Sequence, residues 1–160
     1  MLCLDNNLIL TTAKYLAWRV QNYLELAHAY ADIKAYKAAN KVISYGLNKV
    51  LYLKQIEEQD PPVPDATKEA LVESLRVLRT FEIKYQLHSG ALAPDAWKRK
   101  VEETFASNKQ HRTLCVLESL TTQEPVNSRV MHNSTGAHPW KPQTIKFAVE
   151  LLQPDIELVK

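Results

Sequence analysis

The scarcity of glycine constrains the fold of this chain more than any other feature. Only three glycines occur among its 160 residues. Tight β-hairpin turns and phosphate-binding loops both depend on glycine, because they need positive φ angles or a close approach of the backbone. The shortage argues against a β-rich fold and against a nucleotide-binding loop.

Apolar residues recur at steps of three and four along most of the chain, which predicts amphipathic helices. Six helices are expected, over 8–32, 35–57, 67–88, from Pro94, over 110–121 and over 144–152. The predicted stripes include Leu16, Val20, Leu24, Ala27 and Ala31 in the first helix, Leu71, Leu75, Leu78, Phe81 and Tyr85 in the third, and Leu114, Leu117 and Leu120 in the fifth. The break near 32–34 is short enough to join antiparallel neighbours, so the expected fold class is all-α, built of antiparallel helical hairpins.

Two stretches divide the chain. A connector over 58–66 carries Pro61, Pro62 and Pro64, which cannot continue a helix, and Asp65 or Thr67 is expected to cap the helix that follows. The segment 123–143 is polar and rich in Pro, Ser, Asn and His, which predicts a long loop. The organisation is therefore a helical-hairpin repeat region over 1–122, this loop, and a short C-terminal helix and tail over 144–160.

The stretch between Tyr23 and Gly46 resembles the tetratricopeptide repeat pattern. Small residues at Ala27 and Ala39 would let two helices approach closely, and Gly46 would leave room for the next helix. Tyr30, Tyr36 and Ile43 would fill the space around the small residues. One such repeat cannot bury both of its faces, so neighbouring hairpins must cover it, as in an α-solenoid segment.

No constellation of residues suggests catalysis, a cofactor or a metal. The five histidines, which are His28, His88, His111, His132 and His138, do not form a set with zinc spacing. Cys115 could pair with His111 one turn earlier as a reactive thiolate, but a buried, reduced thiol is the favoured interpretation, as it is for Cys3. We expect neither an enzyme nor a small-molecule substrate, and the sequence assigns no catalytic, cofactor, metal or partner-binding residue.

Net charge and hydropathy limit the classes of partner that this chain can bind. The net charge is +2 with both signs mixed, too little for a nucleic-acid binder. No apolar run approaches the roughly 20 residues of a membrane helix, and the N-terminus lacks a signal-peptide pattern, so a cytoplasmic protein is expected. The lysines at 34, 37, 41 and 49 form either a solvated face or a surface for an acidic tail.

The tryptophans are the best candidates for partner anchors, where they are exposed. They are Trp18, Trp97 and Trp140, of which Trp18 lies off the first stripe and Trp140 lies in the predicted loop.

Two stretches, 31–46 (ADIKAYKAANKVISYG) and 79–88 (RTFEIKYQLH), resemble the cilia- and flagella-associated protein 54 family of very large axonemal proteins. The resemblance implies a segment of a long helical solenoid in a projection on the central-pair microtubules. It also implies a role in ciliary motility and in sperm flagella, with other central-apparatus proteins and microtubules as partners. It carries over no site residue.

Three functional hypotheses remain: a scaffold segment, a free-standing adaptor and an unrecognised helical enzyme. A scaffold segment would present apolar patches at one or both ends, where neighbouring repeats stack. A free-standing adaptor would be a monomer with polar ends and a peptide groove lined by the first two helices. An enzyme would need a pocket with convergent polar groups.

Overall fold

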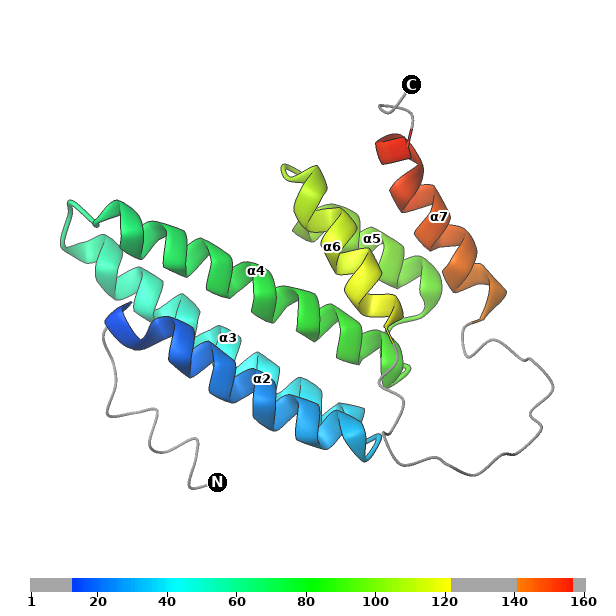
Figure 1. The fold of residues 1–160 in the computed structure, drawn as a ribbon, viewed down its shortest axis with the longest axis horizontal. Coiled ribbons are helices and arrows are strands. Elements are labelled where there is room, and N and C mark those ends of the chain that lie inside the picture. Colours follow the sequence, from blue (N-terminus) through cyan, green and yellow to red (C-terminus); the bar gives the residue numbers. More distant parts are fainter. Residues whose placement is uncertain (1–12, 122–140, 157–160) are drawn as a thin grey trace.

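The structure is a computed structural model that describes residues 13–121 and 141–156, apart from the side chains of 154–156. Within these residues it is all-helical and contains no strand, which confirms the predicted fold class of helical hairpins. The elements (Figure 1) are a short 3-10 helix, η1 (Ala13–Tyr15), followed by α2 (Leu16–Asp32), α3 (Tyr36–Gln59), α4 (Asp65–His88), α5 (Pro94–Thr104), α6 (Lys109–Leu120) and α7 (Pro142–Ile156).

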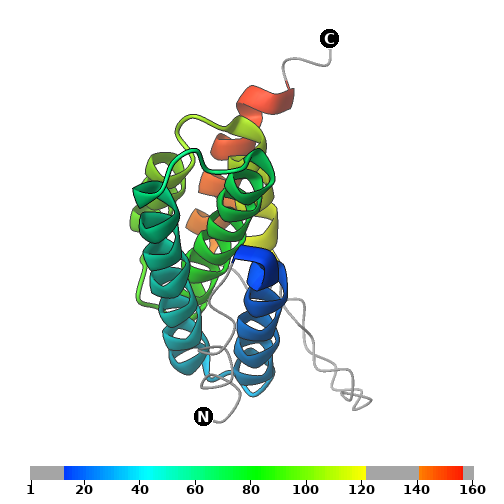
Figure 2. The ribbon, with the colours of Figure 1, turned by 90° about the vertical axis from the view of Figure 1, so that its left-hand side faces the viewer.

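Helix α4 is the central element. It contacts α2 and α3 along one side, and α5 and α6 along another, while α7 packs on α5 and α6. Figure 1 shows α2 and α3 running alongside α4. Helices α5 and α6 lie alongside the second half of α4, and α7 lies on their far side. Seen from the end in Figure 2, α2 and α3 flank α4.

Two apolar cores result from this arrangement, and α4 contributes to both. The first joins α2, α3 and the face of α4 that carries Leu71, Leu75, Leu78 and Tyr85, which are buried as predicted. The second joins α5, α6 and α7 to Ile83 and Leu87 of α4. A helix that is covered on two sides buries two stripes, and the sequence reading identified only the first of them.

Local sequence explains several helix ends. The turn between α2 and α3 is closed by Lys34, whose φ of 59° is left-handed and whose N–H donates to the Ala31 carbonyl at 2.8 Å. Gly90, with φ 76°, follows the last turn of α4, at a position where the left-handed backbone favours glycine. Pro94 is the first residue of α5, and the Asn108 side chain accepts from the His111 N–H at 2.9 Å to cap α6.

Several predicted boundaries were wrong. The connector is shorter than 58–66, because α3 continues to Gln59 and α4 already begins at Asp65. Neither Asp65 nor Thr67 is the N-cap; Pro64 occupies that position without a side-chain bond, and Asp65 accepts from Lys68 Nζ at 2.9 Å. Helix α7 begins at Pro142 and extends past Pro154, so 142–143 are not loop. Residues 8–12 and 123–140 lie outside the described residues.

The predicted stripe of α6 was also wrong. Leu114 and Leu117 are 43% and 51% exposed, while Cys115, Val116 and Ser119 are buried. The physical reason is that α6 packs between α4 on one side and α5 with α7 on the other. These neighbouring helices bury the side of α6 that carries Cys115, Val116 and Ser119, which are smaller than the leucines left exposed.

The small residues of the tetratricopeptide-like hairpin lie where the helices meet. Ala27 and Ala39 are fully buried, as predicted. Gly46 makes room for a residue of the preceding helix rather than the next one, because a Cβ at this position would lie 2.7 Å from Cδ2 of Tyr23. Tyr30 fills less space than predicted, since it remains 37% exposed.

Replacing Gly46 with alanine is therefore expected to destabilise the protein. The added methyl group would overlap the Tyr23 ring close to its rigid base, a type of overpacking that costs about 1–3 kcal/mol and exceeds the gain of about 1 kcal/mol in helix propensity. Urea unfolding followed by circular dichroism measures the difference. The double variant Gly46→Ala/Tyr23→Leu should lose less than the sum of the two single changes, and strict additivity would contradict the proposed overlap.

Candidate interaction surfaces

The described residues contain no group of three or more His, Cys, Asp or Glu side chains that could hold a metal ion. The three described histidines pack on aromatic rings instead. His28 lies edge-on to Phe81 at 5.1 Å between ring centroids, His88 to Tyr36 at 5.1 Å, and His111 to Phe105 at 6.4 Å. His132, His138, Trp140 and Cys3 lie outside the described residues.

Cys115 is a buried thiol within the second core, as the sequence favoured. Burial raises its pKa to about 11, and the nearby Ser119 and Thr80 side chains offset only part of this effect. The thiol therefore stays protonated at neutral pH, and the His111 ring packs on Phe105 instead. The thiolate pair considered from the sequence finds no support in this geometry.

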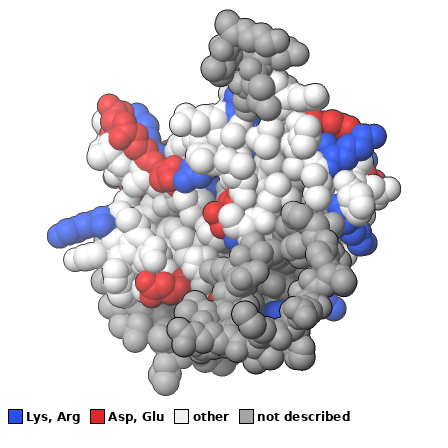
Figure 3. Space-filling view, turned by 45° about the vertical axis from the view of Figure 1, so that its right-hand side comes forward, with Lys and Arg blue, Asp and Glu red and all other residues white. Residues whose placement is uncertain are grey.

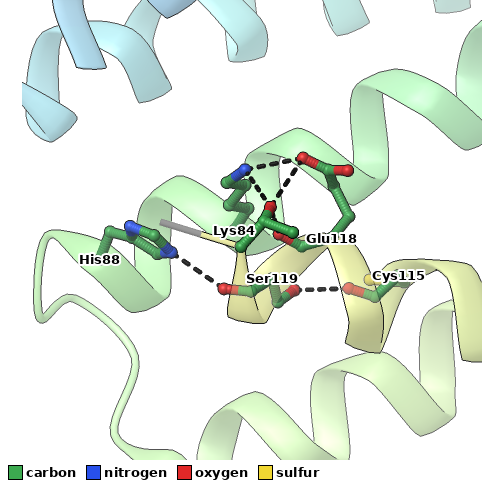
Figure 4. A network of polar contacts seen from close by, with 6 residues as sticks. Lys84, His88, Cys115, Glu118 and Ser119 are labelled. Carbon is green, nitrogen blue, oxygen red and sulfur yellow. Dashed lines mark hydrogen bonds and ion pairs between the residues drawn. The ribbon is translucent and has the colours of Figure 1, made fainter. Parts of the chain in front are cut away.

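A polar network joins α4 to the end of α6 (Figure 4). The ammonium group of Lys84, whose side chain is only 5% exposed, donates to Glu118 at 2.7 Å and to the Thr121 hydroxyl at 2.9 Å. His88 Nε2 lies 2.9 Å from the Ser119 carbonyl, and the Ser119 hydroxyl donates to the Cys115 carbonyl at 2.7 Å. The network fixes α6 against α4 in a single register, and Glu118 also lines a small cavity between these two helices.

The two histidines beside this network predict a pH dependence of stability. Burial, together with the nearby Lys84 charge, lowers the pKa of both His28 and His88, while Glu118 opposes the shift at both and Asp32 opposes it at His28. The unfolded chain then binds protons more readily than the folded one. Stability should be complete above the ordinary value of about 6.5 and fall as the pH drops below it.

Thermal unfolding at pH 7.5 and at pH 5.0 measures this effect, and a lower melting temperature is expected at pH 5.0. The double variant His28→Gln/His88→Gln should show a smaller difference between the two pH values. An equally large difference in the double variant would assign the effect to carboxylates instead.

The first hairpin presents an apolar stripe to solvent. Tyr45, Tyr52 and Ile56 are between 37% and 62% exposed, and they follow one another on α3 at spacings of seven and four residues. On the opposite side of α3, the Tyr36 ring stacks on Tyr85 of α4. We call the line of Lys41, Tyr45, Lys49, Tyr52 and Ile56 the outer face of α3.

The opposite end of the fold is also apolar. Ile145 and Val149, 36% and 50% exposed, lie one turn apart on α7, and α6 adds the exposed Leu117. We call Ile145 and Val149 the α7 face. Figure 3 brings forward the side of the molecule on which α7 lies in Figure 1, and it shows uncharged atoms interspersed with acidic and basic groups. Both ends of the described fold thus carry exposed aliphatic or aromatic side chains.

The tryptophan candidates separate clearly. Trp97 is fully buried in the second core and cannot anchor a partner in the folded state. Trp18, which lies off the predicted stripe, is 52% exposed on α2. The outer face of α3 was missed, although the heptad spacing of Tyr45 and Tyr52 opposite the buried stripe was a usable signal.

Two cavities among the described residues differ in their lining from the groove expected of an adaptor. One of about 220 Å³ lies between α4 and α6, lined by Val77, Phe81 and Leu114 with Arg76, Thr80 and Glu118. Another, of about 470 Å³, lies where α3 begins, between residues 34–38 and the His88–Ser89 end of α4. Neither is lined by α2 and α3 alone, because α4 packs against both of these helices.

No helix within the described residues is long and apolar enough to cross a membrane. The comparisons with known proteins add no relative: no family model, no curated protein and no solved structure matches this chain.

Proposed function

We propose that this protein is a structural scaffold segment that is stacked between helical neighbours, and that the scaffold serves the assembly and motility of cilia and flagella. The observation that carries the proposal is the pair of apolar ends. The outer face of α3 and the α7 face expose tyrosine, isoleucine and valine side chains at the two extremes of the helix packing order. Repeat proteins that end at solvent need polar caps, so such ends favour further helices on either side.

The order of contacts supports the same proposal. Helix α2 contacts α4, α4 contacts α6, and α5 contacts α7, so each hairpin packs on the next as repeats do in a solenoid. The polar network around Lys84 holds α4 and α6 in register, which suits a part that bears load. The expected partners are other central-apparatus proteins and microtubules, and the expected location is the cytoskeleton of the ciliary axoneme. This ciliary assignment rests on the resemblance of 31–46 and 79–88.

The test is localisation in motile ciliated cells. We expect the tagged chain in the axonemal fraction, and we expect Tyr52→Asp/Ile56→Asp to leave that fraction, because two charges on the outer face of α3 would prevent helix packing. Val72→Asp is the matched control, since Val72 is 59% exposed on α4 and belongs to neither end. A diffuse cytosolic signal from the unmodified chain would contradict the ciliary role.

A free-standing adaptor is the alternative, and sedimentation of the isolated chain distinguishes it. An adaptor stays a monodisperse monomer without its ligand. A stacking segment with two uncovered apolar ends self-associates when isolated, and helical neighbours that cover these ends should suppress the self-association. Stable monomeric behaviour at high concentration would count against the scaffold.

A further inference from the structure

Within the described residues, the first hairpin carries an excess of positive charge, most of which is not in an ion pair. Across η1, α2 and α3 (positions 13–59) there are seven basic side chains, Lys14, Arg19, Lys34, Lys37, Lys41, Lys49 and Lys54, against four acidic ones, Glu25, Asp32, Glu57 and Glu58. Both acids of α3 lie in its last turn, beyond Lys41 and Lys49. Among the described residues, every ion pair involves positions from Lys54 onwards. Among the described residues, the hairpin cation that forms an ion pair is Lys54, with Glu58 at 3.6 Å. Farther along the chain, Lys84, Lys98, Lys100 and Lys146 all form ion pairs.

Two of these lysines belong to the outer face of α3. Lys49 Nζ lies 5.3 Å from the centre of the Tyr45 ring, and that ring packs edge-on against Tyr23 at 6.1 Å. Lys41 precedes Tyr45 by one turn and is exposed. The cation over Tyr45 is therefore held beside the aromatic stripe, so anything that covers the stripe must also meet this positive charge.

We infer that the outer face of α3 binds an amphipathic helix whose apolar stripe is flanked by aspartate and glutamate. This inference rests on the proposed scaffold function and names the chemistry of one neighbour. The stripe from Tyr45 to Ile56 runs straight along α3 for about 16 Å, which matches the ridges that a second helix can pack against. Acidic flanks would pair with Lys41 and Lys49, which steers association and rejects partners of the wrong charge.

A second copy of this chain fits the face poorly. Two outer faces brought together would oppose Lys49 to Lys49 without an acid between them. The α7 face of another copy offers Lys141 and Lys146, both exposed, beside its aliphatic residues. Single-stranded nucleic acid fits less well too, because Ile56 and the edge-on packing of Tyr45 leave only Tyr52 free for base stacking.

The experiment titrates the full chain into three labelled probes and follows fluorescence anisotropy. The probes are a synthetic amphipathic helix with a leucine and alanine stripe flanked by glutamates, the same peptide with lysine flanks, and an oligo-dT strand. We expect the glutamate peptide to bind and the lysine peptide not to. Binding should weaken as salt is raised from 50 to 200 mM.

Variants locate the site on the protein. Lys49→Glu should weaken binding of the glutamate peptide about tenfold and improve binding of the lysine peptide, as expected when a rim charge is reversed. Tyr52→Ser should abolish binding of the glutamate peptide. Lys68→Glu, an exposed change on α4 away from the face, should leave binding unchanged, and circular dichroism confirms that each variant is folded.

The outcomes separate this inference from the proposed function. Equal binding of both peptides would overturn the charge selection and leave a scaffold with an unselective apolar face. Binding of oligo-dT alone, of no probe, or self-association that Tyr52→Ser abolishes would each overturn the inference. Failure of the chain to reach the axoneme would contradict the ciliary role without affecting the peptide result.

Discussion

Replacing Trp97 with alanine should lower the free energy of unfolding by about 3–5 kcal/mol, the largest single loss we expect from this protein. Trp97 is fully buried and belongs to the core that joins α5, α6 and α7 to the end of α4. Removing its ring takes away apolar contacts and leaves a cavity among Val101, Phe105 and their neighbours. Urea unfolding followed by far-ultraviolet circular dichroism measures the loss without relying on tryptophan fluorescence.

Trp18 is the matched control. Because its side chain is 52% exposed on α2, Trp18→Ala should change stability by only about 0.5 kcal/mol. The comparison also tests the sequence-based idea that tryptophans mark partner sites. If Trp18→Ala were as costly as Trp97→Ala, then α2 would be covered by another part of the chain, and its exposed side would not be available to a partner.

Replacing Glu118 with leucine should cost about 2 kcal/mol. The change leaves the Lys84 ammonium, 5% exposed, with only the Thr121 hydroxyl and the Phe81 ring, whose centre is 5.5 Å away. Breaking a fully buried ion pair typically costs 3–5 kcal/mol, and we expect less here because the Glu118 side chain is 37% exposed. Chemical denaturation at pH 7 measures the difference.

The double variant Lys84→Met/Glu118→Leu decides whether the cost comes from the stranded charge. It removes both charges and keeps similar volumes, so it should regain most of the stability that Glu118→Leu loses. A double variant that is no more stable than Glu118→Leu would mean that the stranded charge is not the cause of the loss.

The helices and the first core could be predicted from the sequence to a large extent. Leu71, Leu75, Leu78 and Tyr85 follow one 3.6-residue period, and they are buried where that period places them. Gly90 and Pro94 marked the end of α4 and the start of α5 because their backbone preferences are intrinsic to the residue. These signals are local, and they survive whatever packs around them.

The burial of α6 could not be predicted, because a helix with neighbours on two sides does not bury its most apolar stripe by rule. Leu114 and Leu117 satisfy the helical period, yet the positions of α4, α5 and α7 bury Cys115, Val116 and Ser119 instead. The buried Lys84 escaped prediction for a related reason. A lysine looks solvated in a sequence, and only its pairing with Glu118, 34 residues away, makes burial tolerable.

The sequence predicted that apolar patches would lie at the ends of the fold, but it did not predict which residues form them. Apolar ends followed from the idea that one hairpin cannot bury both its faces. The particular residues of the outer face of α3 emerged only once α4 was seen to cover the side of α3 that carries Tyr36. The lysines at 41 and 49 lie beside this exposed apolar stripe. Their position therefore favours a surface for a partner over a merely solvated face.

The sharing of α4 between both cores has a mechanical consequence. Within the described residues, a pull applied between the outer face of α3 and the α7 face would pass mainly through α4, since this helix contributes side chains to both cores and contacts α2, α3, α5 and α6. The load would act across its packed sides rather than along its axis, shearing many side-chain contacts at once. The segment should therefore transmit force as a stiff strut and yield in one step, rather than stretch hairpin by hairpin.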